Sequence, residues 1–79
     1  MNTNDLKPEF QIGKNGLNEN IIKDIKARLK KKKTIKIKFL QSAIKGKNKE
    51  ELFNKLREHT NSRIIKKIGF TVILRYEKH

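Results

Sequence analysis

The chain has 79 residues and no cysteine, and it combines 21 lysines and arginines with 8 acidic residues for a formal net charge of +13. Its length predicts a single domain over residues 1–79 with a small core, and the lack of cysteine excludes disulfides and thiolate metal sites. No segment approaches the roughly 20 apolar residues of a membrane span, and the first residues form no signal-like apolar run, so we expect a cytoplasmic protein. The high charge indicates an anionic partner, with nucleic acid as the first candidate.

The amino-terminal part predicts a lead-in, a strand and a helix. Residues 1–8 should be irregular, and the alternation from Glu9 to Ile12 ahead of a glycine is typical of a short strand. Asn18 can cap a helix over about residues 19–31. One face of this helix is basic, and the expected buried face carries Ile21, Ile22, Ile25 and Leu29.

Residues 34–40 form the clearest predicted strand, because apolar residues alternate there strictly with Lys36 and Lys38. Its apolar face should join the core and its other face should carry the lysines. A strand, a helix and a second strand at these lengths indicate a parallel βαβ unit.

A loop and a second helix should follow. Residues 41–47 contain Gly46 and no useful period, which predicts a loop. Asn48 and Glu51 have the spacing of a capping box at the start of a helix over about residues 49–60. Asn61 is suited to end that helix in the left-handed conformation.

The carboxyl-terminal part predicts a hairpin, with strands over residues 63–68 and 71–76 joined through Gly69-Phe70 and a free tail at 77–79. The register of the first hairpin strand stays open, because its paired isoleucines and paired lysines put like residues on opposite faces. The order β-α-β-α-β-β predicts an α/β protein, a two-layer sandwich with a mixed four-stranded sheet.

A Gly-x-x-Gly sequence between the first strand and the first helix is the main candidate for a binding site. Gly13, Lys14, Asn15 and Gly16 would bring unpaired backbone amides, a cation and the positive end of a helix to one place, which attracts phosphate. Taken alone, the same sequence is often an ordinary turn. The spacing is neither that of a nucleotide-triphosphate loop nor that of a dinucleotide fingerprint.

A lysine-rich surface is the second candidate. Lys23 and the run Lys30, Lys31, Lys32 and Lys33 form a block of cations nearly free of acids, which suits phosphates and should supply affinity rather than sequence choice. The alternative is a solvated helix end whose cations complement the helix dipole. The run and the Gly-x-x-Gly sequence should lie about 20 Å apart, at opposite ends of one helix.

Aromatic stacking is a weaker candidate for recognition. Phe10, Phe39 and Phe53 sit in apolar patterns and should be core, which leaves Phe70 and Tyr76. Shape and backbone recognition are therefore favoured over the reading of splayed bases. His59 has no partner cluster, and the chain shows no catalytic set and no cofactor or metal motif, so we do not expect an enzyme.

Several of these segments resemble the CRM domain family of YhbY-like RNA-binding proteins. The resemblance covers most of the chain and rests on Leu6-Lys7-Pro8, on the stretch from Gln11 to Leu17, on Lys49-Glu50-Glu51-Leu52 and on the stretch from Ile68 to Tyr76. The chain departs from the family pattern at Asn61, where glycine is usual, and in having little of the helix that usually precedes Leu6.

The resemblance implies a fold akin to the C-terminal domain of translation initiation factor three and a role in ribosome assembly or RNA processing. It also implies that Gly13 to Gly16 contact RNA. We therefore expect a monomer that binds structured RNA, such as ribosomal RNA or a pre-ribosomal particle. A DNA-coating chromatin-type protein of similar fold is the alternative. Membrane docking is weaker still, because no hydrophobic anchor accompanies the lysines.

Overall fold

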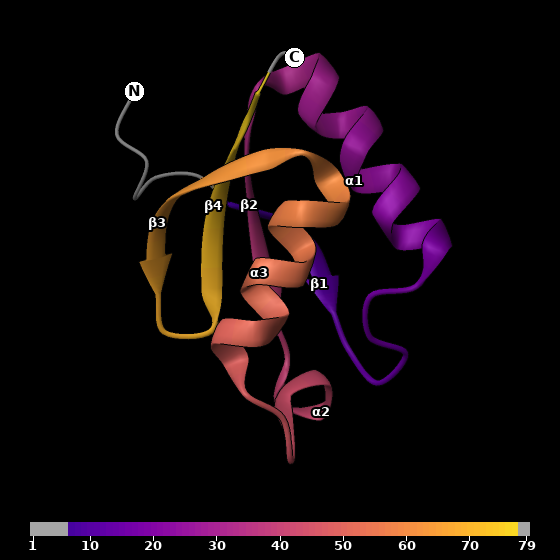
Figure 1. The fold of residues 1–79 in the computed structure, drawn as a ribbon, viewed down its shortest axis with the longest axis vertical. Helices are drawn as coiled ribbons and strands as arrows, with labels where there is room; N and C mark the ends of the chain where they lie inside the picture. The colour runs from indigo at the N-terminus through magenta and orange to yellow at the C-terminus, as the bar shows by residue number, and fades with distance from the viewer. Residues whose placement is uncertain (1–6, 78–79) are drawn as a thin grey trace.

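The computed structural model describes residues 7–77, which form three helices and four strands (Figure 1). The elements are β1 (Pro8–Ile12), α1 (Glu19–Lys32), β2 (Thr34–Phe39), α2 (Gln41–Ile44), α3 (Lys49–Thr60), β3 (Ser62–Ile68) and β4 (Thr71–Tyr76). Apart from α2, each element starts and ends within one residue of the prediction. Most of the expected lead-in and tail, residues 1–6 and 78–79, lies outside the described residues.

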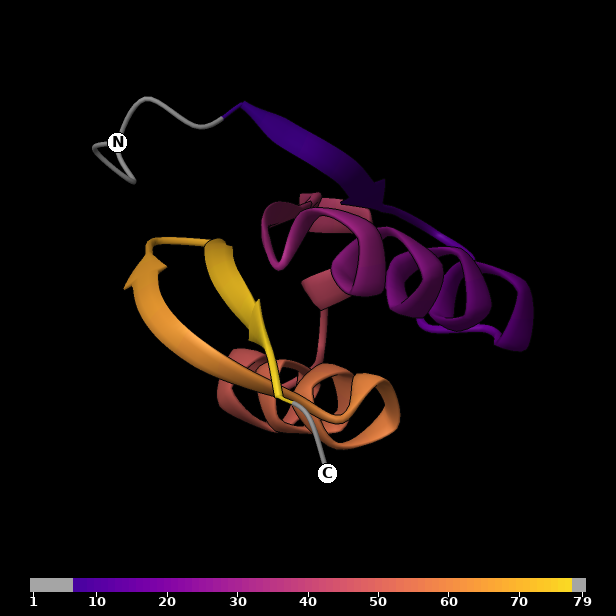
Figure 2. The same ribbon diagram turned by 90° about the horizontal axis from the view of Figure 1, so that it is seen from above.

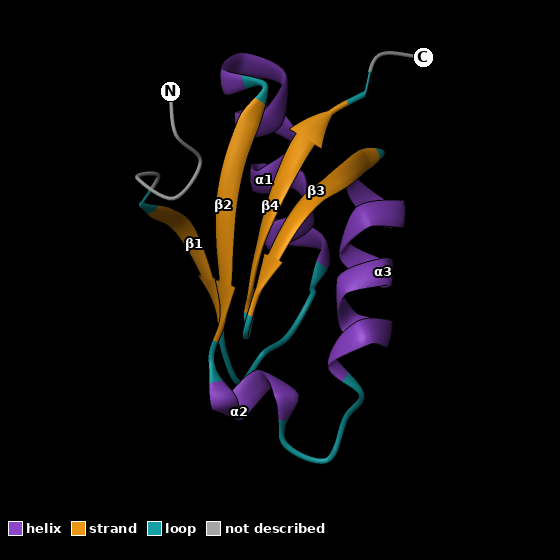
Figure 3. Cartoon of the chain, turned by 90° about the vertical axis from the view of Figure 1, so that its left-hand side faces the viewer, coloured by secondary structure: helices purple, strands orange, loops and turns teal. Residues whose placement is uncertain are grey.

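The strands form a mixed four-stranded sheet in the order β1-β2-β4-β3, and Figure 3 shows them side by side in this order from left to right. β1 pairs with β2 in parallel, as the βαβ pattern predicts, and β4 runs antiparallel to both of its neighbours. The parallel pairing follows from α1, which carries the chain back along the sheet before β2 begins. The predicted α/β sandwich with a mixed sheet is confirmed.

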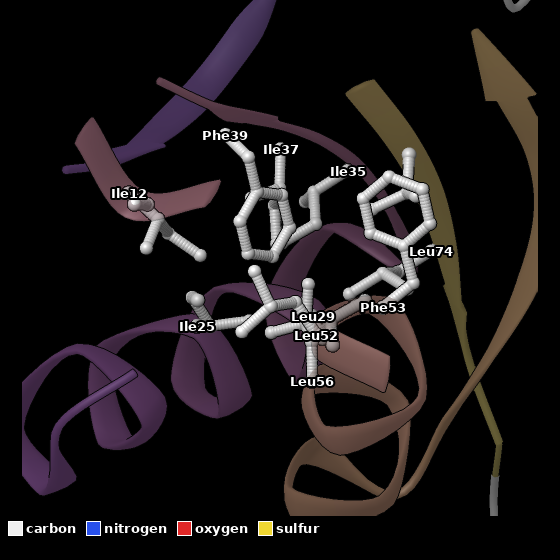
Figure 4. Close-up of a cluster of buried hydrophobic side chains, with 12 residues drawn as sticks. Ile12, Ile25, Leu29, Ile35, Ile37, Phe39, Leu52, Phe53, Leu56 and Leu74 are labelled. Carbon is white, nitrogen blue, oxygen red and sulfur yellow. The ribbon is translucent and has the colours of Figure 1, made fainter. Parts of the chain in front are cut away.

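Both long helices cover the same face of the sheet, as Figure 2 shows from above. The core lies between the sheet and these helices, where Ile25 and Leu29 of α1 belong to the same buried cluster as Phe53 and Leu56 of α3 (Figure 4). The ring centroids of Phe39 and Phe53 lie 5.3 Å apart, and the rings are tilted, an arrangement that aromatic pairs prefer. The alternation of β2 puts its isoleucines and Phe39 into this core and its lysines on the face that the helices leave open.

Asparagines bound both long helices. The Asn18 side chain accepts a hydrogen bond from the Ile21 amide at 2.9 Å, as an N-cap does. Asn48 accepts from the Glu50 amide rather than from Glu51, so the predicted capping box is wrong in its partner although the cap is in place. Asn61 adopts the left-handed conformation, with φ of 50°, and ends α3 as predicted.

The prediction of a loop over residues 41–47 is wrong, because residues 41–44 form the short helix α2. Ala43 is buried against the core and Ile44 packs at its edge, so tertiary contacts stabilise this turn of helix. A single turn is too short to show a 3.6-residue period, and short isolated helices are marginal without packing. The sequence therefore carried no local signal for α2.

Pairing with β4 settles the register of β3. Ile64 pairs with Leu74 and Lys66 pairs with Ile73, so Ile65 is the extra residue of a β-bulge. Ile64 packs against the core, whereas Ile65 is 40% exposed. The bulge thus lets one of the two adjacent isoleucines face the core while the other is exposed, which decides the faces of β3 that the sequence left open.

Candidate functional site

The segment from Gly13 to Gly16 forms a tight turn between β1 and α1. The Gly16 amide donates to the Gly13 carbonyl at 2.9 Å, and Gly16 has a φ of +65°, which glycine adopts without strain. Lys14 and Asn15 occupy the central positions of the turn and are exposed. The second glycine is therefore required by the backbone, and the two residues between the glycines face solvent.

The amides around this turn divide into paired and unpaired groups. Asn18 accepts from Ile21 with its side chain and from Ile22 with its carbonyl, and its own amide donates to Gly16. Within residues 7–77, no hydrogen bond is made by the amides of Lys14, Asn15, Leu17, Glu19 and Asn20. A helix of 14 residues begins here, so its positive end adds to these donors. Free amides at a helix start can bind an anionic oxygen.

The turn is held at the end of the sheet by backbone contacts. The Leu40 amide donates to the Ile12 carbonyl at 2.8 Å, which ties the residue before the turn to the residue before α2. A Cβ placed on Gly13 would lie 3.5 Å from Leu40 Cδ1 and 3.7 Å from Ser42 Oγ. The turn and α2 are thus immediate neighbours.

The tip of the β3–β4 hairpin reaches the same end of the sheet. The Phe39 amide donates to the Phe70 carbonyl at 2.8 Å. Phe39, the last residue of β2, therefore holds the hairpin tip, and the next residue, Leu40, holds the end of β1. Phe70 is 42% exposed and, with residues of α2 and Lys45, lines a pocket beside the turn. Sequence reasoning named Phe70 but missed Gln41, Ser42, Ile44 and Lys45, which lie in the segment predicted to be a loop.

The lysine run at the other end of α1 is not uniform. Lys32 Nζ lies 2.6 Å from Glu9 Oε1 of β1, and Lys33 Nζ lies 4.7 Å from the centroid of the Tyr76 ring. Lys30 and Lys31 are exposed, as is Lys23 about two turns earlier. All four lysines of the run are exposed, but Lys32 and Lys33 contact the protein itself, whereas Lys30 and Lys31 face solvent without an ion pair or ring contact to residues 7–77.

The structure does not bring the two candidate surfaces together. Figure 1 shows the turn at the lower end of α1 and the lysine run at its upper end. This arrangement agrees with the separation expected from the helix length. A ligand that contacts both must extend along the whole of α1.

The face of the sheet opposite the helices adds further cations that were not assigned to a site. Lys36 and Lys38 of β2 lie on it, and Arg75 of β4 pairs with Arg63 of β3. Directly opposed like charges destabilise a sheet, and a polyanion would relieve the repulsion. Among the described residues, no group of three or more His, Cys, Asp or Glu side chains could hold a metal ion, and none of their helices is long and apolar enough to cross a membrane.

Comparison with known proteins gives a consistent picture. The model of the CRS1 / YhbY (CRM) domain family matches residues 1–75. The chain is 36% identical over 69 residues to the Probable RNA-binding protein YqeI of Bacillus subtilis (strain 168), covering 87% of this chain and 70% of that protein. Its fold is similar to the solution structure of the hypothetical protein SAV1595 from Staphylococcus aureus, with a TM-score of 0.75 and 37% identity over 96% of this chain and 77% of the other.

Proposed function

Because this chain belongs to the CRS1 / YhbY (CRM) domain family, we propose that it is a non-enzymatic protein that binds the backbone of structured RNA. The similar protein YqeI carries RNA binding in its name, and the surface charge of this chain suits the same partner. The residues that we assign to the contact are Gly13, Lys14, Asn15 and Gly16, with Lys23 and the run from Lys30 to Lys33 as a second contact.

The observation that carries this proposal is the exposed turn with unpaired amides at the start of α1. Unpaired amides can bind phosphate oxygens without regard to base identity, and the exposed Lys14 adds a cation that needs no bidentate geometry. The separation of the turn from the lysine run favours an RNA with folded or helical structure, since one rigid ligand must reach along α1. A short single strand would contact one surface or the other.

The finer assignment is to ribosomal RNA or a pre-ribosomal particle, in the cytoplasm and as a monomer. It rests on the family resemblance, which implies work in ribosome assembly or RNA processing. Crosslinking the protein to RNA in cells and sequencing the attached RNA would identify the target. Recovery of ribosomal precursors supports the assignment, and recovery of unrelated transcripts without them contradicts it.

A salt titration tests the binding mode. If the protein neutralises about six phosphates, its affinity for a folded RNA should fall about a thousandfold between about 50 and 200 mM salt, because bound counterions are released on association. The affinity is measured by fluorescence anisotropy with a labelled stem-loop RNA. A flat response to salt contradicts backbone recognition.

A DNA-coating function is the rival reading, and a competition experiment separates the two. The labelled stem-loop is challenged with unlabelled RNA duplex and with DNA duplex of the same length. We expect RNA to compete better, because the A-form helix presents a wide minor groove with 2′-hydroxyls. Stronger competition by DNA would favour the chromatin-type function.

A further inference from the structure

A pocket is lined by residues of α2, by Lys45 and by Phe70 at the tip of the β3–β4 hairpin. α2, the hairpin tip and the segment that joins β1 to α1 lie at the same end of the sheet (Figures 1 and 3). Its volume is about 480 Å³, and its walls are formed by Gln41, Ser42, Ile44, Lys45 and Phe70. Small-molecule pockets typically enclose about 300–1,000 Å³. The space is therefore sufficient for the base and sugar of one nucleotide.

The chemistry of the walls matches a nucleobase. Phe70 supplies an exposed aromatic ring and Ile44 a partly buried aliphatic side chain, which suit the flat face of a base. Gln41 carries both a donor and an acceptor, and Ser42 carries a hydroxyl, which suit its polar edge. Lys45 adds a cation for the attached phosphate.

The ring of Phe70 is positioned by its neighbours. Lys49 Nζ lies 5.4 Å from the ring centroid and donates to the Gly69 carbonyl at 3.3 Å. Gly69 has a φ of +57° at the first central position of the hairpin, as in a type II′ turn, and Phe70 follows at the second. An aromatic ring can take a cation on one face and a base on the other, so Lys49 leaves the ring able to stack.

The pocket and the turn are neighbours through Ser42. Ser42 lines the pocket, and its hydroxyl is the group that a Cβ on Gly13 would approach at 3.7 Å. A nucleotide joins its phosphate to its base through a single sugar. A phosphate at the free amides of the turn would thus leave its base beside the pocket.

On the premise of the RNA-binding function above, we propose that this pocket holds one unpaired base of the bound RNA, stacked against Phe70, while the adjoining phosphate lies at the Gly13–Gly16 turn. The surrounding charge favours a nucleotide over a peptide. The sequence has no acidic residue between Asp24 and Glu50, Lys45 lines the pocket, and Lys49 Nζ lies over the Phe70 ring. The preferred RNA is then a folded one with a bulge or loop next to a helix, rather than an uninterrupted duplex.

The test compares two RNA stems that differ in one nucleotide. One is fully paired, and the other carries a single unpaired 2-aminopurine, a fluorescent base that is quenched by stacking. Wild-type protein should bind the bulged stem about tenfold more tightly and quench its fluorescence, consistent with the stacking of one base. Phe70→Leu should abolish both the preference and the quenching, and Phe70→Tyr should retain them. Ile65→Ala is the matched control, because Ile65 is 40% exposed on the same hairpin but away from its tip.

The outcomes distinguish this inference from the proposed function. If wild-type protein binds both stems equally and Phe70→Leu binds them as the wild type does, the base pocket is wrong while RNA binding stands, and a protein segment becomes the better occupant. If wild-type protein binds neither stem, both proposals fail. Thermal melting of each variant checks that it is folded. If leucine disturbs the hairpin, Phe70→Tyr still tests the proposal, because it keeps an aromatic ring at this position.

Discussion

The two ends of α1 use charge in different ways. At the amino end, few side chains are charged, but unpaired amides and the positive helix end gather beside the exposed Lys14. At the carboxyl end, four consecutive lysines lie at the negative end of the helix dipole, and Lys32 and Lys33 contact Glu9 and Tyr76. From the sequence, the carboxyl end looks like the stronger phosphate-binding surface. In the structure, two of its four lysines already interact with Glu9 and Tyr76.

This difference teaches that the number of lysines overstates a binding surface. A lysine that already neutralises a carboxylate or a helix end gains less from a phosphate, because that interaction must first be given up. Fixed amides have no such competitor. We therefore expect the lysine end to supply salt-sensitive affinity and the turn to fix the position of the bound RNA. Three sets of variants test this difference.

The largest expected effect comes from removing the solvent-facing pair of the lysine run. The double variant Lys30→Ala/Lys31→Ala should bind folded RNA about a hundredfold more weakly at about 50 mM salt and lower the salt slope by about two, because each lysine accounts for about one phosphate. Lys14→Ala should lose about tenfold and lower the slope by about one. Anisotropy titrations at several salt concentrations give both values.

The control for that comparison is Lys55→Ala, which removes an exposed lysine from α3 without touching either end of α1. Its slope and affinity should stay near those of the wild type. An equal loss from Lys55→Ala would show that only total charge matters and that neither end of α1 is a site.

A smaller effect should follow from straining the turn. Gly16→Val places a β-branched residue at a φ of +65°, which costs about 1–2 kcal/mol in the free energy of unfolding. Gly13→Ala should cost less, because Gly13 has no positive φ and its added Cβ would meet only ordinary contacts. Urea unfolding measures both variants, and equal destabilisation by the two would contradict the assigned turn geometry.

The smallest effect separates Lys32 from Lys31. Lys32→Ala breaks the ion pair with Glu9 and should lower the free energy of unfolding by about 0.5 kcal/mol, a usual value for a partly exposed pair. Lys31→Ala should leave stability unchanged but weaken RNA binding more than Lys32→Ala does. The reverse ranking in binding would mean that RNA displaces Glu9 from Lys32.

Local patterns predicted most of the fold. Strict alternation identified β2, the apolar spacing of the helices identified their buried faces, and the asparagines at residues 18 and 61 marked where helices begin and end. The Gly-x-x-Gly turn could also be predicted, because a glycine at residue 16 indicates a backbone position with positive φ. These features depend on neighbours within a few positions, which a single sequence displays.

Other features came only from packing between distant segments. The register of β3 was decided by its pairing with β4, and α2 was decided by the burial of Ala43. The pocket beside the turn needed three separate segments to meet at the end of β2, so Phe70 could be named as an exposed aromatic but not placed next to Gly13.

The sequence by itself determined the order of the two long helices and the four strands, the buried faces of those helices and of β2, and the positive φ of the turn, because these follow from residue type and short spacing. Only the tertiary structure decided which lysines contact the protein and which face solvent, since Lys32 meets Glu9 23 positions away and Lys33 lies over Tyr76. Such long-range pairs depend on how the segments pack, and no local pattern encodes them.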